Sequence, residues 1–152
     1  MDAEVYTDLR VADFITERFV PVRLHVKDQH DEFQRVGAEF GAQWTPTVLI
    51  VEDGDERHRI EGFLPADDFL SQLKLGVARA AFKRSDYATA HELYRAVVDE
   101  FPTSEAAAEA LYWAGVSKYR ATNDASALKD TASFFKNRYQ ETSWAKKASI
   151  WS

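Results

Sequence analysis

The sequence contains no cysteine, and this absence excludes more chemistry than any other feature of its composition. Without thiols, the 152 residues can form no disulfide, no thiolate nucleophile and no thiolate metal site. Long hydrophobic runs are also missing, and no stretch approaches the roughly 20 apolar residues of a membrane-spanning helix. The first residues lack the basic start and apolar stretch of a secretory signal, which favours a cytoplasmic location. Basic residues are in the minority, 19 against 25 acidic ones, so we expect no binding to nucleic acid.

The two halves of the chain differ in charge and in composition. Residues 1–75 hold 8 basic and 16 acidic residues, a balance of −8, whereas residues 76–152 hold 11 and 9, a balance of +2. The first half carries most of the prolines and glycines between short β-branched runs, which is typical of a mixed α/β fold. The second half is rich in alanine, with aromatic residues at helical spacing, which predicts an all-α fold. We therefore expect two modules, residues 1–75 and 76–152, joined near Leu75-Gly76.

Apolar periodicity predicts two helices and one strand before Gly41. Residues 8–19 place apolar side chains on one helical stripe, and Asp8 can cap the first turn. Residues 20–27 alternate strictly between apolar and polar side chains, which is the pattern of a strand with one buried face. Residues 33–40 follow as a short helix that Gly41 ends.

Three further elements complete the first module. Residues 47–51 are apolar on both faces, which predicts a central strand. Residues 52–55 have the composition of a hairpin turn, and residues 57–63 form a more polar partner strand, expected at the edge of the sheet. Pro65 then opens a long helix, at a first-turn position that needs no amide hydrogen.

This order of elements and several short motifs resemble the thioredoxin-like superfamily, in the subgroup of thioredoxin-7-type domains. The resemblance covers residues 1 to about 75 and is most specific at Trp44-Thr45-Pro46, directly before the apolar strand. Weaker matches lie at residues 4–8, 11–14, 19–22 and 60–63. The resemblance implies an α/β thioredoxin-like fold in which Pro46 is cis and Thr45 offers its backbone groups to an extended peptide. It also implies that Trp44 lies beside the peptide groove and that Gly62 lets the chain pass close beneath the site. For Trp44, packing in the core is an equally supported alternative.

The chain departs from this family at its start. Members begin with a central strand and a Cys-x-x-Cys turn, whereas this sequence begins at Met1, just past the place of that turn. We therefore expect an incomplete thioredoxin-like domain, with its first strand missing, that has no catalytic residue, metal or cofactor. Such a domain would bind a protein or an extended peptide in the manner of a co-chaperone. The alternative is a fragment of a thiol-disulfide oxidoreductase whose Cys-x-x-Cys lies upstream of Met1.

The resemblance places the missing strand between residues 20–26 and residues 47–51. Its removal would leave two rows of backbone groups without partners, at a cost of about 1–3 kcal/mol for each buried group. We expect either that these two strands pair directly or that a segment of another chain fills the gap. The second case would be a homo-oligomer or a strand swap.

Residues 71–104 fit the roughly 34-residue pattern of tetratricopeptide repeats, and a looser likeness continues to about residue 149. Ala78 and Ala90 fall at small positions where two helices touch, and Tyr94 and Pro102 fall at further positions of the pattern. In the looser second unit, Gly115 falls at the position where the repeat pattern expects a tight helix contact. The resemblance is to repeats of bacterial envelope and co-chaperone proteins. It implies all-α tetratricopeptide-like helical hairpins that bind peptides or proteins on a concave surface.

Other clusters of polar and aromatic residues favour ordinary structural roles. The histidines and carboxylates of residues 25–32 lack the fixed spacing of a metal site, so a solvated loop is the stronger interpretation. His58 and His91 have no partner in a nucleophile motif, which leaves acid–base catalysis unsupported. The tryptophans expected to close helix interfaces are Trp113, Trp144 and Trp151. The charged groups expected to be solvated are Glu52, Asp53, Asp55 and Glu56 at the turn, and Lys136, Arg138, Lys146 and Lys147 near the C-terminus.

Overall fold

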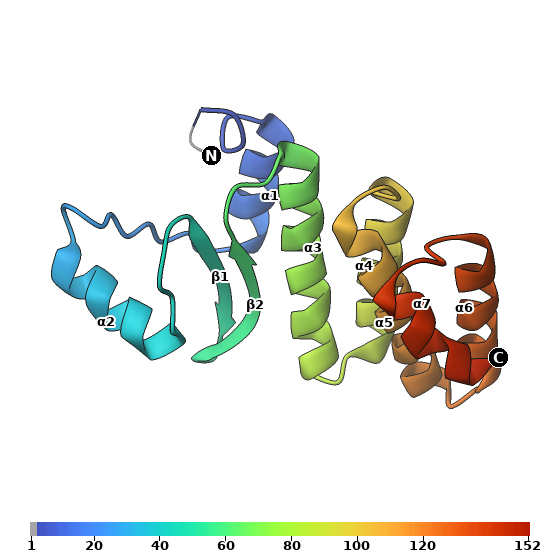
Figure 1. Ribbon diagram of the computed structural model, residues 1–152. Helices are drawn as coiled ribbons and strands as arrows, with labels where there is room; N and C mark the ends of the chain where they lie inside the picture. The colour runs from blue at the N-terminus through green and yellow to red at the C-terminus, as the bar shows by residue number, and fades with distance from the viewer. Residues whose placement is uncertain (1–2) are drawn as a thin grey trace. The chain divides into compact units, whose positions relative to one another are not determined.

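A computed structural model describes residues 3–152, and the chain divides into two compact units (Figure 1). The first unit ends at Leu70 and the second begins at Ser71. The division falls inside helix α3 (Ala66–Lys83) and not in a flexible linker. It lies a few residues before Leu75-Gly76, where the change in composition suggests the junction.

The two helices expected before Gly41 are both present in the first unit. Helix α1 spans Leu9–Arg18, and the carboxylate of Asp8 caps it by accepting a hydrogen bond of 2.9 Å from the Arg10 amide. Helix α2 spans His30–Phe40 and ends at Gly41, whose φ of 64° lies in the left-handed region that favours glycine. The helix and cap predictions for this part of the chain are confirmed.

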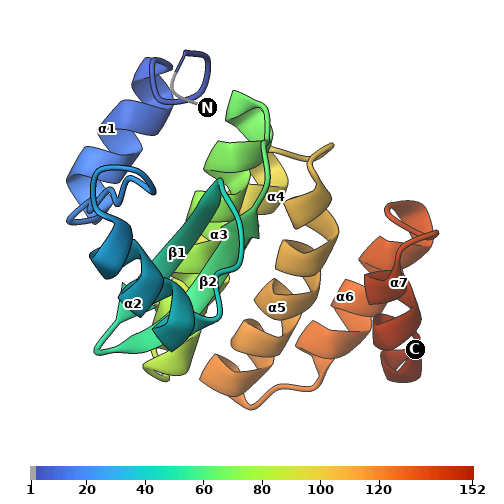
Figure 2. The same cartoon turned by 60° about the vertical axis from the view of Figure 1, so that its left-hand side comes forward.

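The sheet found in the described part of the first unit is a single antiparallel hairpin (Figures 1 and 2). Strand β1 spans Thr47–Glu52 and strand β2 spans Asp55–Glu61. The two turn residues, Asp53 and Gly54, have φ values of 53° and 82°, and a type I′ turn needs positive φ at both positions. The turn predicted from composition is therefore present, and it matches the twist of the two strands.

The strand predicted for residues 20–27 is absent, and this prediction is wrong. These residues form an irregular connection between α1 and α2, in which Val20 is 91% and Val22 is 80% exposed. An alternating segment needs a neighbouring strand for its hydrogen bonds and a surface that covers its apolar face. Neither is supplied by the residues that the structure describes.

Two related expectations concern the neighbours of β1. Of the two alternatives for residues 20–26, direct pairing with residues 47–51 is not found, since the pairing described for β1 is with β2 alone, and a segment supplied by another chain stays a prediction. Strand β1 is therefore not central, and its side chains are mostly half-buried, with Val51 42% exposed. The apolar run that suggested burial on both faces belongs to a strand with one open edge.

The core of the first unit is small. Its fully buried apolar side chains are Val5, Val11, Ile50, Ile60, Phe69 and Leu70. The ring of Tyr6 meets Phe69 edge-on, with centroids 5.8 Å apart, and so ties the N-terminal segment to the first turns of α3. No side chain of α2 is fully buried.

The second unit is all helical, as its composition predicts. After α3 come α4 (Tyr87–Glu100), α5 (Glu105–Thr122), α6 (Ser126–Asn137), α7 (Ser143–Ala148) and the short 3-10 helix η1 (Ser149–Trp151). Consecutive helices from α4 onward pack against each other, and Figure 2 shows α5, α6 and α7 side by side. Their shared core is mostly alanine, which lets the helix backbones approach closely.

Helices α5 and α6 meet tightly at Gly115. A Cβ atom placed there would lie 2.8 Å from the Cβ and 2.9 Å from the Cγ2 of Thr131, closer than packed side chains come. Glycine is needed at this position by the close approach of the two helices and not by its backbone conformation.

The remaining positions of the repeat pattern also lie in the core of the second unit or border it. Ala78 and Ala90 are fully buried in one cluster with Tyr94, which is 1% exposed. Burial raises the pKa of the Tyr94 hydroxyl well above its ordinary value. Pro102 is half-buried, and its carbonyl oxygen accepts a hydrogen bond of 2.6 Å from the Tyr139 hydroxyl.

Candidate functional site

The loop between α2 and β1 carries the three residues expected to face a peptide. Trp44 is 66% exposed, and Thr45 and Pro46 are exposed beside it. The Thr45–Pro46 peptide bond is cis, the isomer that the resemblance implies. Tryptophan side chains are on average largely buried, so an indole this exposed stands out. The loop therefore offers a large apolar side chain to a molecule that approaches from outside.

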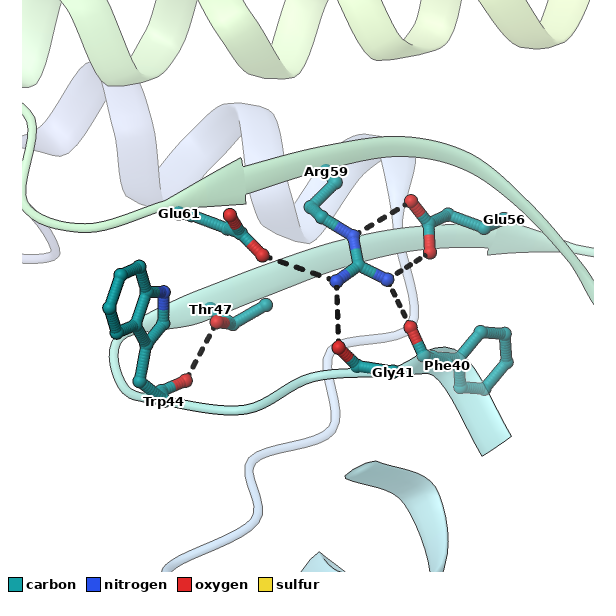
Figure 3. A network of polar contacts seen from close by, with 7 residues as sticks. All are labelled: Phe40, Gly41, Trp44, Thr47, Glu56, Arg59 and Glu61. Carbon is teal, nitrogen blue, oxygen red and sulfur yellow. Dashed lines mark hydrogen bonds and ion pairs between the residues drawn. The ribbon is translucent and has the colours of Figure 1, made fainter. Parts of the chain in front are cut away.

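The end of the loop that enters β1 is held by two hydrogen bonds. The Gly62 amide donates to the Pro46 carbonyl at 2.9 Å, which extends the contact between the two strands by one step. The Thr47 hydroxyl donates to the Trp44 carbonyl at 2.7 Å across the turn of the loop (Figure 3). These bonds fix the backbone on both sides of Thr45.

Gly62 owes its place to its backbone conformation. Its φ of 84° lies in the left-handed region, which L side chains adopt at a cost. A Cβ atom at Gly62 would meet no described atom within 4 Å. The resemblance implies that glycine is needed because the chain passes close beneath the site. In this structure glycine is needed for its backbone conformation instead.

The other end of the loop is held by Arg59 (Figure 3). Its guanidinium donates to the carbonyl oxygens of Phe40 and Gly41, where α2 ends and the partial negative charge of the helix is concentrated. The same group lies 2.6 Å from a carboxylate oxygen of Glu56 and 3.2 Å from one of Glu61. The hydrogen bonds from Arg59 lower the pKa of Glu56, and the two carboxylates raise the pKa of Arg59.

Arg59 was not among the residues that the sequence pointed to. The available signal is a basic residue on a strand with Glu56 three positions before it and Glu61 two positions after it. That spacing indicates an ion-pair cluster. It cannot indicate the helix carbonyls, which lie 18 and 19 positions earlier in the chain.

The backbone of Thr45 is open to a partner. Within residues 3–152, neither its amide nor its carbonyl takes part in a hydrogen bond. A backbone donor and acceptor in an exposed loop can pair with an extended peptide as a neighbouring strand would. The loop thus combines an apolar side chain with two polar backbone groups at adjacent residues.

The histidines stand apart from this loop and have structural surroundings. His58 lies in β2 and is 6% exposed. His91 Nδ1 lies 2.9 Å from the Ala114 carbonyl oxygen and so joins α4 to α5. Neither histidine belongs to the loop of Trp44, Thr45 and Pro46.

The polar segment of residues 25–32 remains an exposed surface. His25 Nδ1 lies 3.1 Å from Asp28 Oδ2, and both side chains are largely solvent-exposed. His30, Asp31 and Glu32 begin helix α2. Residues 3–152 bring together no group of three or more His, Asp and Glu side chains that could hold a metal ion.

The tryptophans of the second unit lie in a chain of ring contacts. Trp113 and Trp144 each contact Tyr112, with centroids 5.4 and 5.3 Å apart, and Trp151 stacks on Tyr112 at 4.6 Å. The ammonium of Lys147 lies 3.8 Å from the centroid of Trp144. These rings join α5, α7 and η1, as expected of residues that close helix interfaces.

Comparison with protein families identifies the first unit. A family profile described as the thioredoxin-like domain matches residues 1–76, half of the chain. The chain belongs to the thioredoxin-like family. No curated protein and no solved structure matches the chain. The helices in residues 3–152 include none that is both long and apolar enough to cross a bilayer.

Proposed function

We propose that this chain is a protein-binding module of the thioredoxin-like family, which docks an extended peptide at Trp44, Thr45 and Pro46. The observation that carries the proposal is the juxtaposition of an indole 66% exposed with the unengaged backbone of Thr45. A peptide in extended conformation would exchange backbone hydrogen bonds with Thr45, and one of its apolar side chains would lie on the indole. The Thr45 backbone and the Trp44 indole make contacts that depend little on the peptide's sequence. The module would therefore bind many unfolded segments.

The proposed role involves binding without electron transfer. Disulfide exchange needs a thiolate that attacks sulfur, and the sequence contains no cysteine. The fixed backbone around Thr45 supports this role, because a loop held at both ends loses little conformational freedom when a peptide binds. Gly62 and Arg59 supply those two fixed ends.

We further propose that the second unit consists of tetratricopeptide-like hairpins and gives the module a co-chaperone-like character. Support comes from the spacing of Ala78, Ala90, Tyr94 and Pro102 and from the tight helix contact at Gly115. Repeats of this type bury faces between neighbouring helices and present a surface to protein partners.

The test of peptide docking uses reduced, carboxymethylated α-lactalbumin, an unfolded polypeptide whose blocked thiols exclude disulfide chemistry. Its affinity for the wild-type chain and for Trp44→Ala is measured by isothermal titration calorimetry. We expect Trp44→Ala to weaken binding about tenfold or more, as the truncation of a central aromatic contact does. The exposure of Trp44 means that the variant keeps the fold, which circular dichroism verifies.

The matched control is Phe134→Ala. Phe134 is an aromatic side chain of comparable exposure, 51%, but lies on α6 in the second unit. Its truncation should leave the affinity within about twofold of the wild type. Equal losses for the two variants, or no loss for Trp44→Ala, would overturn the proposal.

A further inference from the structure

The first unit presents two features that the docking loop does not use. One is the open edge of β1, the side of Thr47–Glu52 that faces away from β2. The other is the 20–26 segment, which has the side-chain pattern of a strand but no strand beside it. The β1 edge could accept a further strand, and the 20–26 segment could supply one.

The open edge of β1 is suited to a further strand. In residues 3–152, β1 pairs with β2 and with no other strand, so the backbone groups on its second side face no ladder partner. A bare edge of this kind is a template for pairing with another chain. Val51 adds an apolar side chain, 42% exposed, close to that edge.

The 20–26 segment is an apolar strand pattern left in solvent. Its apolar side chains alternate with polar ones, and Val20, Val22 and Val26 are 91%, 80% and 40% exposed. Transfer of an apolar side chain from water to a covered position stabilises the structure that covers it. The segment would therefore gain from any neighbour that covered this face.

Charge makes the two features complementary. The hairpin residues 47–61 hold five acidic residues and two arginines, a balance of −3, whereas the 20–26 segment and Lys27 hold two basic residues and no acidic one. Parallel pairing of the segment with β1 would bring Lys27 to the acidic end of the strand, at Glu52 and Asp53. Antiparallel pairing would bring it instead to Thr47, the end of the hairpin that carries the single carboxylate of Glu61.

We propose that a second copy of this chain supplies the missing neighbour: the 20–26 segment of each copy adds as a parallel strand to the open β1 edge of the other. Every copy carries both the segment and the edge, so a reciprocal exchange between two copies closes as a two-fold symmetric dimer. The proposed pairing uses the β1 edge at Thr47–Glu52 and the 20–26 segment, and its tests do not depend on peptide docking.

The first test is the mass in solution. Analytical ultracentrifugation of the wild-type chain over a series of concentrations should show a monomer–dimer equilibrium. Val22→Glu places a charge on the apolar face beside an acidic hairpin and should raise the dimer dissociation constant about tenfold or more. The control Leu9→Glu alters a side chain of similar exposure, 76%, on α1 of the same unit and should change the constant by less than about twofold.

The second test exploits the cysteine-free sequence. Val22→Cys chains mixed with Leu49→Cys chains should form a disulfide-linked heterodimer under mild oxidation. Leu9→Cys chains mixed with Leu49→Cys chains should give far less of it. A strict monomer at every concentration, or equal cross-linking in both mixtures, would refute the exchange.

Discussion

The Gly62 amide donates a hydrogen bond of 2.9 Å to the Pro46 carbonyl, so the end of β2 is joined to the loop that carries the exposed indole. Gly62 holds this position with a φ of 84°. An alanine there would keep the amide but would have to adopt the left-handed conformation. The position of the loop and the conformation of one glycine are therefore linked.

Gly62→Ala should destabilise the chain by about 1 kcal/mol, the cost of left-handed backbone for a residue with a Cβ atom. Steric overlap should add nothing, since a Cβ atom at Gly62 would have no described atom within 4 Å. Urea unfolding followed by circular dichroism measures the change. Gly62→Asn, which tolerates this conformation better, should cost less, and an equal or larger cost for asparagine would contradict the explanation.

Gly115→Ala should destabilise the second unit by about 1–3 kcal/mol, for the opposite reason. Here the added methyl group would overlap the side chain of Thr131 on α6. Thermal unfolding of Gly115→Ala, Thr131→Ala and the double variant forms a double-mutant cycle. The double variant should recover part of the loss, whereas strictly additive effects would show that the two helices do not meet at this pair.

Arg59→Met should make the stability of the chain less dependent on acid pH. The pKa of Glu56 is lowered in the folded state by its hydrogen bonds from Arg59. A carboxyl with a lowered folded-state pKa adds stability above its ordinary pKa, and that stability is lost as the pH falls through the lowered value. The wild type should therefore be more stable than the variant near neutral pH, and the gap should narrow on acidification.

The control for Arg59 is Arg35→Met. Arg35 also lies near two carboxylates, Glu32 at 3.6 Å and Glu39 at 3.4 Å, but its side chain is 65% exposed against 24% for Arg59. Exposed pairs of this kind contribute little. Urea unfolding over a series of pH values should show a small, nearly constant effect for Arg35→Met. A gap for Arg59→Met that stays constant with pH would refute the role assigned to Glu56.

The chain should not reduce insulin. In the presence of dithiothreitol, the rate of insulin B-chain precipitation should equal that of dithiothreitol alone, because no thiolate is available to form a mixed disulfide. Turnover above that baseline by the purified chain would contradict the proposal of binding without redox chemistry.

The sequence predicts the features of the fold that depend on local interactions. The cap at Asp8, the end of α2 at Gly41 and the turn at Asp53-Gly54 depend on neighbours within a few residues, and all are present. The alternation in residues 20–27 is equally clear. A strand also requires a neighbouring strand, however, and the sequence of one segment does not show whether such a neighbour is present. The failure there is one of tertiary context and not of pattern.

The candidate site divides in the same way. Trp44, Thr45 and Pro46 form a motif that is contiguous in sequence, and the structure places all three in an exposed loop, so the alternative that Trp44 packs in the core is wrong. Arg59 reaches this region through carbonyl groups that lie far from it in the sequence. Every residue has a backbone carbonyl, so the sequence does not indicate which carbonyls accept a hydrogen bond from Arg59. These supporting contacts can be identified only from the structure.

The most direct test of the central claim is a nuclear magnetic resonance titration of the labelled chain with reduced, carboxymethylated α-lactalbumin. Binding at the proposed loop should shift the backbone amide signal of Thr45 and the indole signal of Trp44 first and most strongly, with Gly62 close behind. Unchanged signals at Thr45 and Trp44, with shifts confined to the second unit, would contradict the proposal that an extended peptide docks at this loop.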